Sequence, residues 1–172
     1  RDKSQNVKSI VTQLKNHHRF ETESSRKVYR PWGWFDTLEI GNNFNSGKDY
    51  IELTKRFISE LYAYQTEGVL FNPTLAYDTP FRLDEISALS YFIGNNSDFK
   101  EDKGFALLGW TSVRFENIGI KIEGEIAIAM GNYFFKKTDE DEVKVEYTFV
   151  YKKDDSGKLC IILHDSHFPY KK

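Results

Sequence analysis

The feature that most constrains the fold is a change in hydrophobic period at Gly104. Before Gly104, apolar residues recur every three or four positions, which is the spacing of amphipathic helices. After Gly104 they alternate with polar residues, as in half-buried strands, and residues 143–151 alternate most regularly. Helices followed by an antiparallel meander predict an α+β fold, with helices packed on a curved, mostly antiparallel sheet. We expect this sheet to form a cone with a pocket at one end.

The segments before Gly104 predict four helices and one short strand. Their apolar spacing places the helices at residues 7–16, 31–40, 49–64 and 85–93, and the strand at residues 68–74. Pro31 suits the first turn of the second helix, and Gly41 weakens the helical pattern after it. Asp84 is placed to cap the fourth helix, and Gly94 is placed to end it.

The segments after Gly104 predict strands at residues 105–117, 118–122, 126–135, 143–151 and 159–167, with a hairpin turn signal at Glu123-Gly124. In the last strand, alternation places Cys160, Ile162, His164 and Ser166 in one row, and Leu159, Ile161, Leu163, Asp165 and His167 in the other. Both rows become polar at the end of the strand. We therefore expect His164 and Ser166 at the rim of a pocket, and Cys160 as a small buried side chain rather than a nucleophile.

The chain of 172 residues has the length of one domain. Eight basic and three acidic residues fall in positions 1–30, so we interpret residues 1–26 as a basic arm or linker and residues 27–172 as a single domain. Because the chain begins with Arg1, we expect a processed form or a domain of a longer protein. Its 24 Lys and Arg nearly balance its 26 Asp and Glu, which argues against a nucleic acid partner. The apolar runs are too short for a membrane helix, so we expect a soluble protein.

Several kinds of catalytic site are excluded by the residues that the chain lacks. It has no glycine-rich phosphate loop and no Gly-x-Ser-x-Gly nucleophile elbow, and its single cysteine excludes an internal disulfide. Of its four histidines, His17 and His18 lie in the arm, while His164 and His167 fall on opposite faces of a strand. We therefore expect no three-histidine zinc site. A mixed metal site with distant carboxylates stays open.

Six segments resemble the iota-class carbonic anhydrases, and together they cover about residues 27–170. The segments are Val69-Leu70-Phe71-Asn72-Pro73-Thr74 with Phe81-Arg82-Leu83, Ala88-Leu89-Ser90-Tyr91-Phe92, Gly104-Phe105-Ala106-Leu107 with Trp110, residues 126–132, and the closing residues 163–170. The resemblance implies the fold of the calcium/calmodulin-dependent kinase association domain and the SnoaL-like cyclases, a cystatin-like α+β cone. It also implies a lyase that hydrates carbon dioxide to bicarbonate without zinc. It implies no cofactor, although manganese stays open.

The same resemblance implies a set of site residues. It assigns catalytic roles to Tyr91, His164 and Ser166, and substrate binding to Thr74, Tyr91 and Ser166. His164 would accept the proton of water or carry it out of the site. The closing motif of the family usually reads His-His-Ser-Ser-x-Pro-Tyr, and this chain departs from it at Asp165 and His167. By alternation both departures face away from His164 and Ser166.

Two other functions fit the same fold. One is a non-enzymatic association domain that acts by oligomerisation. The other is a cyclase-like enzyme with a larger hydrophobic substrate in a cavity lined by Phe71, Tyr91, Phe92, Trp110, Tyr147 and Phe149. For either carbonic anhydrase or association domain we expect a homodimer that pairs through the outer sheet face. A domain with a basic arm also fits a multidomain algal protein, so we expect a plastid location.

Overall fold

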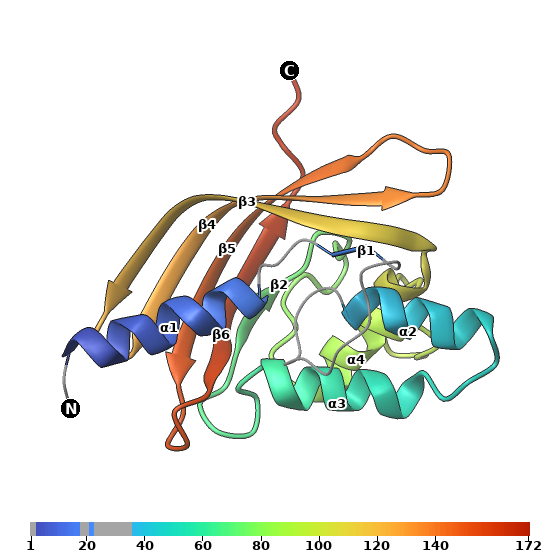
Figure 1. The fold of residues 1–172 in the computed structure, drawn as a ribbon. Helices are drawn as coiled ribbons and strands as arrows, with labels where there is room; N and C mark the ends of the chain where they lie inside the picture. Colours follow the sequence, from blue (N-terminus) through green and yellow to red (C-terminus); the bar gives the residue numbers. More distant parts are fainter. Residues whose placement is uncertain (1–2, 18–20, 23–35) are drawn as a thin grey trace.

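The computed structural model describes residues 3–17, 21–22 and 36–172. Its helices are α1 (Lys3–His17), α2 (Asp36–Asn45), α3 (Ile51–Leu61) and α4 (Glu85–Ile93), and Phe105–Leu107 form a 3₁₀ turn. Its strands are β1 (Glu21–Thr22), β2 (Leu70–Asn72), β3 (Trp110–Glu123), β4 (Ile126–Lys137), β5 (Val143–Lys153) and β6 (Leu159–His167). Figure 1 shows the sheet curving over α2, α3 and α4. The α+β fold predicted from the change in period is confirmed.

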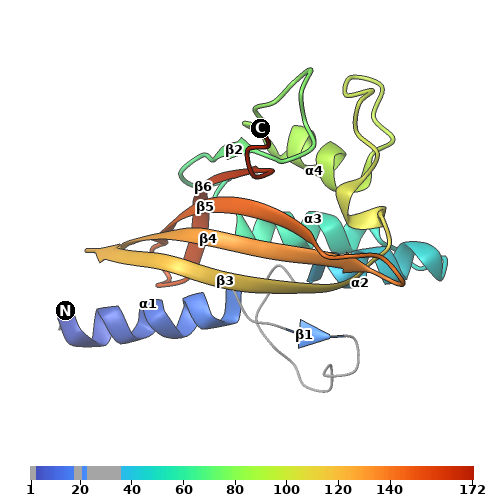
Figure 2. The ribbon, with the colours of Figure 1, turned by 90° about the horizontal axis from the view of Figure 1, so that it is seen from above.

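The strands form one sheet in the order β1-β3-β4-β5-β6-β2, and Figure 2 shows the run from β3 to β2. Strands β3 to β6 pair in antiparallel fashion, whereas β2 pairs in parallel with β6. In that parallel pair Phe71 lies opposite His164 and Asn72 lies opposite Asp165. The residues that follow β2 therefore run beside the last residues of β6, and this is where the candidate site forms.

Helix α4 has the boundaries that its capping residues predict. The Asp84 side chain accepts a hydrogen bond from the Ser87 backbone N–H at 2.8 Å, and the helix ends at Gly94 with φ +65°. A side chain at Gly94 would be strained in this left-handed conformation and would crowd the Asp102 carbonyl oxygen at 3.1 Å. These two residues therefore fix where α4 starts and stops.

Helix α2 continues through Gly41, which was expected to weaken it. A Cβ atom at this position would lie 2.7 Å from the Ala106 carbonyl oxygen. Glycine is needed here because the helix approaches the 3₁₀ turn closely. The predicted start at Pro31 lies outside the described residues.

The segment after Gly104 does not begin as a strand, so that prediction is wrong. Gly104 has φ +77°, and Phe105–Leu107 turn as a 3₁₀ helix whose Phe105 carbonyl accepts a hydrogen bond from Trp110 Nε1 at 2.8 Å. The two strands expected at residues 105–117 and 118–122 are one strand, β3, with a register shift between Asn117 and Gly119.

Another register shift lies in β6. Val150 pairs with Leu163, but Tyr151 pairs with Ile161, so Ile162 is the extra residue of a bulge. The expected row of Cys160, Ile162, His164 and Ser166 is therefore wrong upstream of the bulge. His164 and Ser166 still share the buried face, and Cys160 is buried as expected.

Helix α1 confirms the helical pattern found within the basic arm, and it packs against the sheet. Its Ile10 and Leu14 side chains are buried in the core. The Asn6 amide donates to the Gly124 carbonyl oxygen at 2.8 Å, and Gln13 accepts a hydrogen bond from the Leu159 N–H at 2.7 Å. Figures 1 and 2 show α1 beside the sheet at the end away from α2, α3 and α4. The boundary expected between residues 26 and 27 lies outside the described residues.

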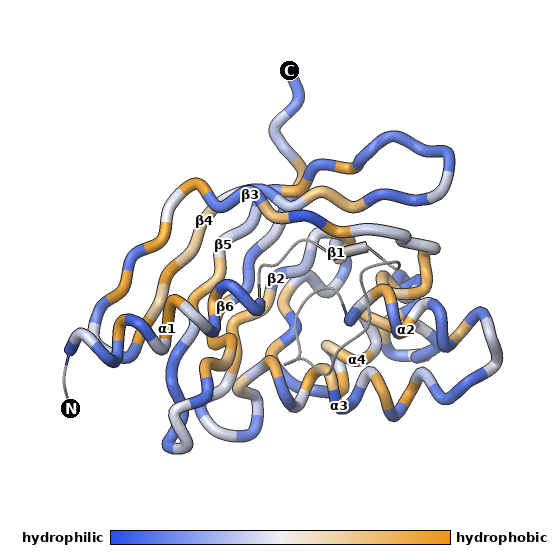
Figure 3. Tube along the Cα trace, in the orientation of Figure 1, coloured by the Kyte–Doolittle hydropathy of each residue, from blue (hydrophilic) through white to orange (hydrophobic). Residues whose placement is uncertain are grey.

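The interior is filled by aromatic rings, including those considered as lining for a large cavity. Phe71 and Phe92 stack with centroids 6.0 Å apart, and Tyr147 lies 5.2 Å from Phe149. Figure 3 shows how apolar and polar residues alternate along the helices and strands that enclose these rings. Contact between rings leaves them as core residues, which disfavours a cyclase-like pocket built from them. Within the part of the chain that the structure describes, no helix is long and apolar enough to cross a membrane.

Candidate active site

Two hydroxyl groups form the centre of the site. Thr74 Oγ1 and Ser166 Oγ lie 2.8 Å apart, within hydrogen-bond distance. The parallel pairing of β2 with β6 explains this contact, because Thr74 follows Asn72, and Asn72 lies beside Asp165 in the register. Pro73 ends the strand and lacks the N–H that a further ladder bond would need. We call Thr74 and Ser166 the hydroxyl pair.

A third hydroxyl, from Tyr133 on β4, joins the hydroxyl pair. The Tyr133 phenol lies near the Ser166 and Thr74 hydroxyls, which act on its pKa as hydrogen-bond partners. Burial raises the pKa of Tyr133 above its usual value, although these two hydroxyls act in the opposite direction. The phenol is therefore protonated at neutral pH.

Sequence reasoning missed Tyr133, although one signal was available. The inward row of β4 begins with the small residues Ala127, Ala129 and Gly131. Small residues leave space in the interior of a sheet, and the first large polar side chain after them is Tyr133. A phenol in such a row needs a partner for its hydroxyl when it is buried.

His164 is enclosed, which corrects the expectation that it lies at the rim of a pocket. Its side chain is 1% exposed. Its ring stacks between Phe71 and Phe149, with centroids 4.7 and 4.3 Å away. Nδ1 lies 3.0 Å from the Tyr62 hydroxyl, and Nε2 lies 3.4 Å from the Tyr133 hydroxyl. His164 is thus linked to the hydroxyl pair through Tyr133.

Tyr91 reaches the same region from α4. Its ring stacks on Phe105 at 5.6 Å, and its phenol lies near the backbone of Leu75, the residue after Thr74. Burial raises the pKa of Tyr91 well above its usual value, so the phenol is a hydrogen-bond donor rather than a base at neutral pH.

A small cavity lies beside the Tyr91 ring. Its volume is about 90 Å³, and its lining is Leu75, Tyr91, Glu101, Asp102, Lys103, Phe105 and Leu108. Since one water molecule takes up about 30 Å³ in the liquid, this cavity suits a molecule of a few heavy atoms. This cavity is too small for the larger substrate of a cyclase.

A buried ionic cluster holds the loop after Thr74 against α4. The Arg82 guanidinium binds both carboxylate oxygens of Asp102, at 2.7 and 2.8 Å, and lies 3.3 Å from Glu101. The Glu101 carboxylate in turn accepts the backbone N–H groups of Tyr77, Asp78 and Thr79. This cluster fixes the loop that carries Thr74 and Leu75.

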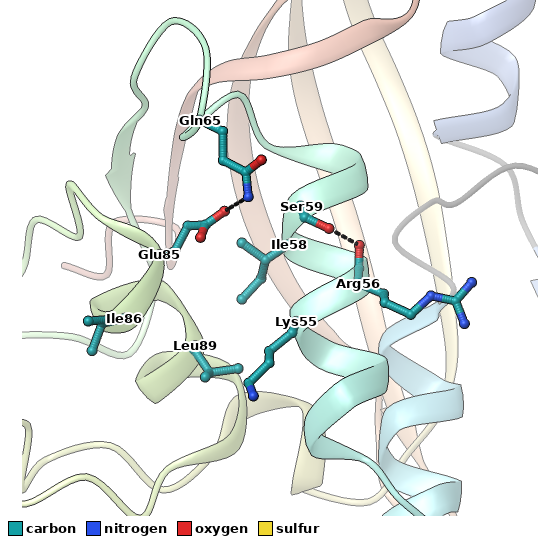
Figure 4. A pocket seen from close by; sticks show the side chains of 8 residues that line it. All are labelled: Lys55, Arg56, Ile58, Ser59, Gln65, Glu85, Ile86 and Leu89. Atoms are coloured by element: carbon teal, nitrogen blue, oxygen red, sulfur yellow. Dashed lines mark hydrogen bonds between the residues drawn. The ribbon is translucent and has the colours of Figure 1, made fainter.

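A larger hollow of about 350 Å³ lies between α3 and α4 (Figure 4). Its lining is Lys55, Arg56, Ile58, Ser59, Gln65, Glu85, Ile86 and Leu89. Gln65 donates a hydrogen bond to Glu85 within it, at 3.1 Å. The hollow contains none of the predicted site residues, so its size does not make it the active site.

Asp165 and His167 face away from the site, as alternation predicts. His167 Nε2 lies 3.1 Å from Glu146 on β5, and Nδ1 lies 3.5 Å from Asp165. Among the described residues, no group of three or more His, Cys, Asp and Glu side chains is placed to hold a metal ion.

Comparison with known proteins places the chain in a family. Residues 27–168 match the family described as "Metal-independent carbonic anhydrase". The chain belongs to this family. It is 42% identical over 120 residues to the metal-independent carbonic anhydrase of Nostoc sp.. That alignment covers 69% of this chain and 58% of the Nostoc protein, so it spans less than two thirds of the relative.

Solved structures agree with this membership in the metal-independent carbonic anhydrase family. The iota-carbonic anhydrase from a cyanobacterium, complexed with bicarbonate, superposes with a TM-score of 0.80 at 30% identity, covering 96% of this chain and 93% of that one. A putative dehydratase of the NTF2-like family from Streptomyces avermitilis has a TM-score of 0.51 at 10% identity, over 98% of this chain and 99% of that one. The second likeness shows the fold alone.

Proposed function

We propose that this chain catalyses the reversible hydration of carbon dioxide to bicarbonate, as an iota-class carbonic anhydrase. The observation that carries the proposal is the convergence of Thr74, Ser166 and Tyr133 hydroxyls from three separate segments of the family fold. Neutral hydrogen-bond donors that are held in place before the reaction stabilise charge as it develops on substrate oxygens. The bicarbonate complex of the cyanobacterial structure supports an anion of this size as the ligand.

In this proposal Thr74, Tyr91 and Ser166 bind the oxygens of bicarbonate. Tyr91 and Ser166 also act in catalysis, because their hydroxyls would stabilise the carboxylate that forms as water attacks carbon dioxide. The raised pKa of Tyr91 supports a donor role, since its phenol keeps its proton at neutral pH. We place the substrate between the hydroxyl pair and the Tyr91 side of the site.

His164 is the proposed proton acceptor. Attack by water on carbon dioxide forms the carbon–oxygen bond and breaks one O–H bond of the water, and the released proton needs a base. Imidazole is the side chain whose ordinary pKa, about 6.5, suits this role near neutrality. His164 lies behind the hydroxyl pair and contacts Tyr133.

We propose that the reaction proceeds without a bound zinc ion, and we leave manganese as the alternative cofactor. The family description supports the first part. A metal would lower the pKa of bound water to about 7. In this proposal hydrogen bonds and the imidazole perform that task instead.

Two further proposals concern assembly and location. The outer face of the sheet carries the exposed Met130 of β4 and, near it, the half-buried Ile128, Val150 and Leu163, which pair across β4, β5 and β6. Exposed apolar side chains that lie together are typical of interfaces, so we propose a homodimer formed through this face. We also propose a plastid location, which imaging of the tagged full-length protein would test.

The function is tested by stopped-flow carbon dioxide hydration with the parent chain and Thr74→Val. Valine keeps the shape of threonine and removes the hydroxyl, so the variant should fold. The parent should accelerate hydration over buffer, and Thr74→Val should lose about tenfold or more of that acceleration. A parent chain that does not exceed the buffer rate would contradict the proposal.

A further inference from the structure

A buried chain of polar groups leads from Tyr62 to the hydroxyl pair. The Tyr62 hydroxyl contacts His164 Nδ1 at 3.0 Å, and His164 Nε2 contacts the Tyr133 hydroxyl at 3.4 Å. The Tyr133 phenol in turn lies near the Ser166 and Thr74 hydroxyls, which lower its pKa as hydrogen-bond partners. Residues from α3's end, β6 and β4 are thus connected to the site by side chains alone. Tyr133 occupies the middle of this chain.

The three rings of this polar series, those of Tyr62, His164 and Tyr133, are held in place, so that their polar atoms have fixed neighbours. Tyr62 and Tyr133 are both 2% exposed, and His164 is stacked between two phenylalanines. The His164 ring lies at 16° to Phe71 and 21° to Phe149, which leaves it little freedom to turn over. Because the His164 ring cannot turn over, the directions of its hydrogen bonds depend on which of its two nitrogens carries a hydrogen.

The hydrogen bonds from His164 to the hydroxyl pair can run in two directions, depending on which nitrogen of the neutral imidazole carries the hydrogen. A neutral imidazole has one nitrogen that donates and one that accepts. If Nε2 accepts, Tyr133 donates to it, and the phenol oxygen accepts one hydrogen from the hydroxyl pair. The other hydrogen of the pair fills the bond between Thr74 and Ser166, so the pair offers only lone pairs to a ligand.

The other direction has the opposite result at the site. If Nε2 carries the hydrogen, it donates to the Tyr133 oxygen, and the Tyr133 hydrogen turns to Ser166 or Thr74. One hydrogen of the hydroxyl pair is then released toward a ligand. An anion such as bicarbonate is bound by donors and repelled by lone pairs, so only this direction suits it.

We infer that Tyr133 is a positioning residue that transmits the Nε2–H polarity of His164 to the hydroxyl pair, so that the pair donates to the bicarbonate anion. The inference rests on the proposed function for its ligand and deepens it by assigning Tyr133. It also agrees with proton acceptance by His164, because a proton taken up from water would reside on Nε2.

The test uses ¹⁵N NMR of the histidine side chains in the full chain, with bicarbonate as the probe. The chain has four histidines, so spectra of single variants at His17, His18 and His167 assign the His164 signals by difference. In the bicarbonate-bound protein we expect Nε2 of His164 to be protonated. An unprotonated Nε2 in that complex would overturn the inference.

Tyr133→Phe tests the link itself and keeps the ring volume. We expect bicarbonate to bind about tenfold more weakly, because one positioned donor is lost from an anion site. We also expect the His164 signals to stop responding to bicarbonate. Tyr147→Phe is the matched control, since Tyr147 is a buried neighbour, 5.3 Å from the Tyr133 ring, whose hydroxyl donates to Asn117 instead. It should keep the affinity and the His164 response of the parent.

Failure of the inference is distinguishable from failure of the proposed function. A parent chain that does not bind bicarbonate overturns both. A parent that binds it, together with Tyr133→Phe binding equally well, overturns the role of Tyr133 and leaves the proposed function standing. Should Tyr133→Phe fail to fold, the protonation of Nε2 in the parent complex decides the question alone.

Discussion

The hydroxyl oxygens of Thr74 and Ser166 lie 2.8 Å apart although 92 positions separate them in the sequence. The contact exists because a three-residue strand, β2, pairs in parallel with the last strand of the sheet. Both side chains come from the ends of paired strands, which are rigid supports for a site.

Ser166→Ala and Tyr91→Phe should each reduce the hydration rate about ten- to hundredfold, because a hydrogen bond to a charged group is worth about 1.5–3 kcal/mol. Stopped-flow assays give the rates. His167→Ala and Asp165→Ala are the controls, since both residues face away from the site. If the two control variants lost as much activity as Ser166→Ala, the placement of Asp165 and His167 on the face away from the site would be contradicted.

The protein should lose stability as pH rises above about 10, the ordinary pKa of tyrosine. Burial raises the pKa of Tyr62, Tyr91 and Tyr151 in the folded state. Above the ordinary value the unfolded chain therefore binds fewer protons than the folded chain, and the free energy of unfolding falls with pH. Thermal unfolding between pH 8 and 11.5 measures it. A midpoint that stays constant through pH 11 would show that these phenols ionise freely when folded.

Arg82→Met should destabilise the fold by about 3–5 kcal/mol, because it leaves the buried carboxylates of Glu101 and Asp102 without their cation. Urea unfolding measures the loss. Lys55→Met is the control, since the Lys55 ion pair with Glu52 is exposed and worth little. Equal stability of both variants would show that the cluster does not hold the loop.

Light scattering should give a mass of about twice the chain mass of 20.2 kDa at micromolar concentration. Met130→Lys should dissociate the dimer, because it places a charge in the apolar outer face. Ile86→Lys, at an exposed site on α4, should leave the mass unchanged. A parent mass near that of one chain would refute the dimer.

Most of the fold could be predicted because local signals agree with the tertiary structure. Asp84 and Gly94 bound α4 as their capping chemistry predicts, and alternation locates β4 and β5. The errors occur where a long-range contact overrides a local preference. Gly41 lies inside α2 because Ala106 approaches it, and the bulge at Ile162 follows from pairing with β5.

The site was predicted less completely than the fold. Thr74 and Ser166 were identified through the family resemblance, and the structure brings them into contact. Tyr62 and Tyr133 were missed because their roles depend on contacts with His164 across 102 and 31 positions. Periodicity reports which face a residue lies on, but it carries no information on which hydroxyls meet.

Hydration of carbon dioxide without a metal is tested by stopped-flow assays of the purified chain, before and after exhaustive treatment with a chelator. Elemental analysis of the same samples reports zinc and manganese. We expect hydration well above the buffer rate that is unchanged by the chelator and does not follow metal content. Hydration that disappears with the chelator and returns with about one equivalent of zinc would contradict it.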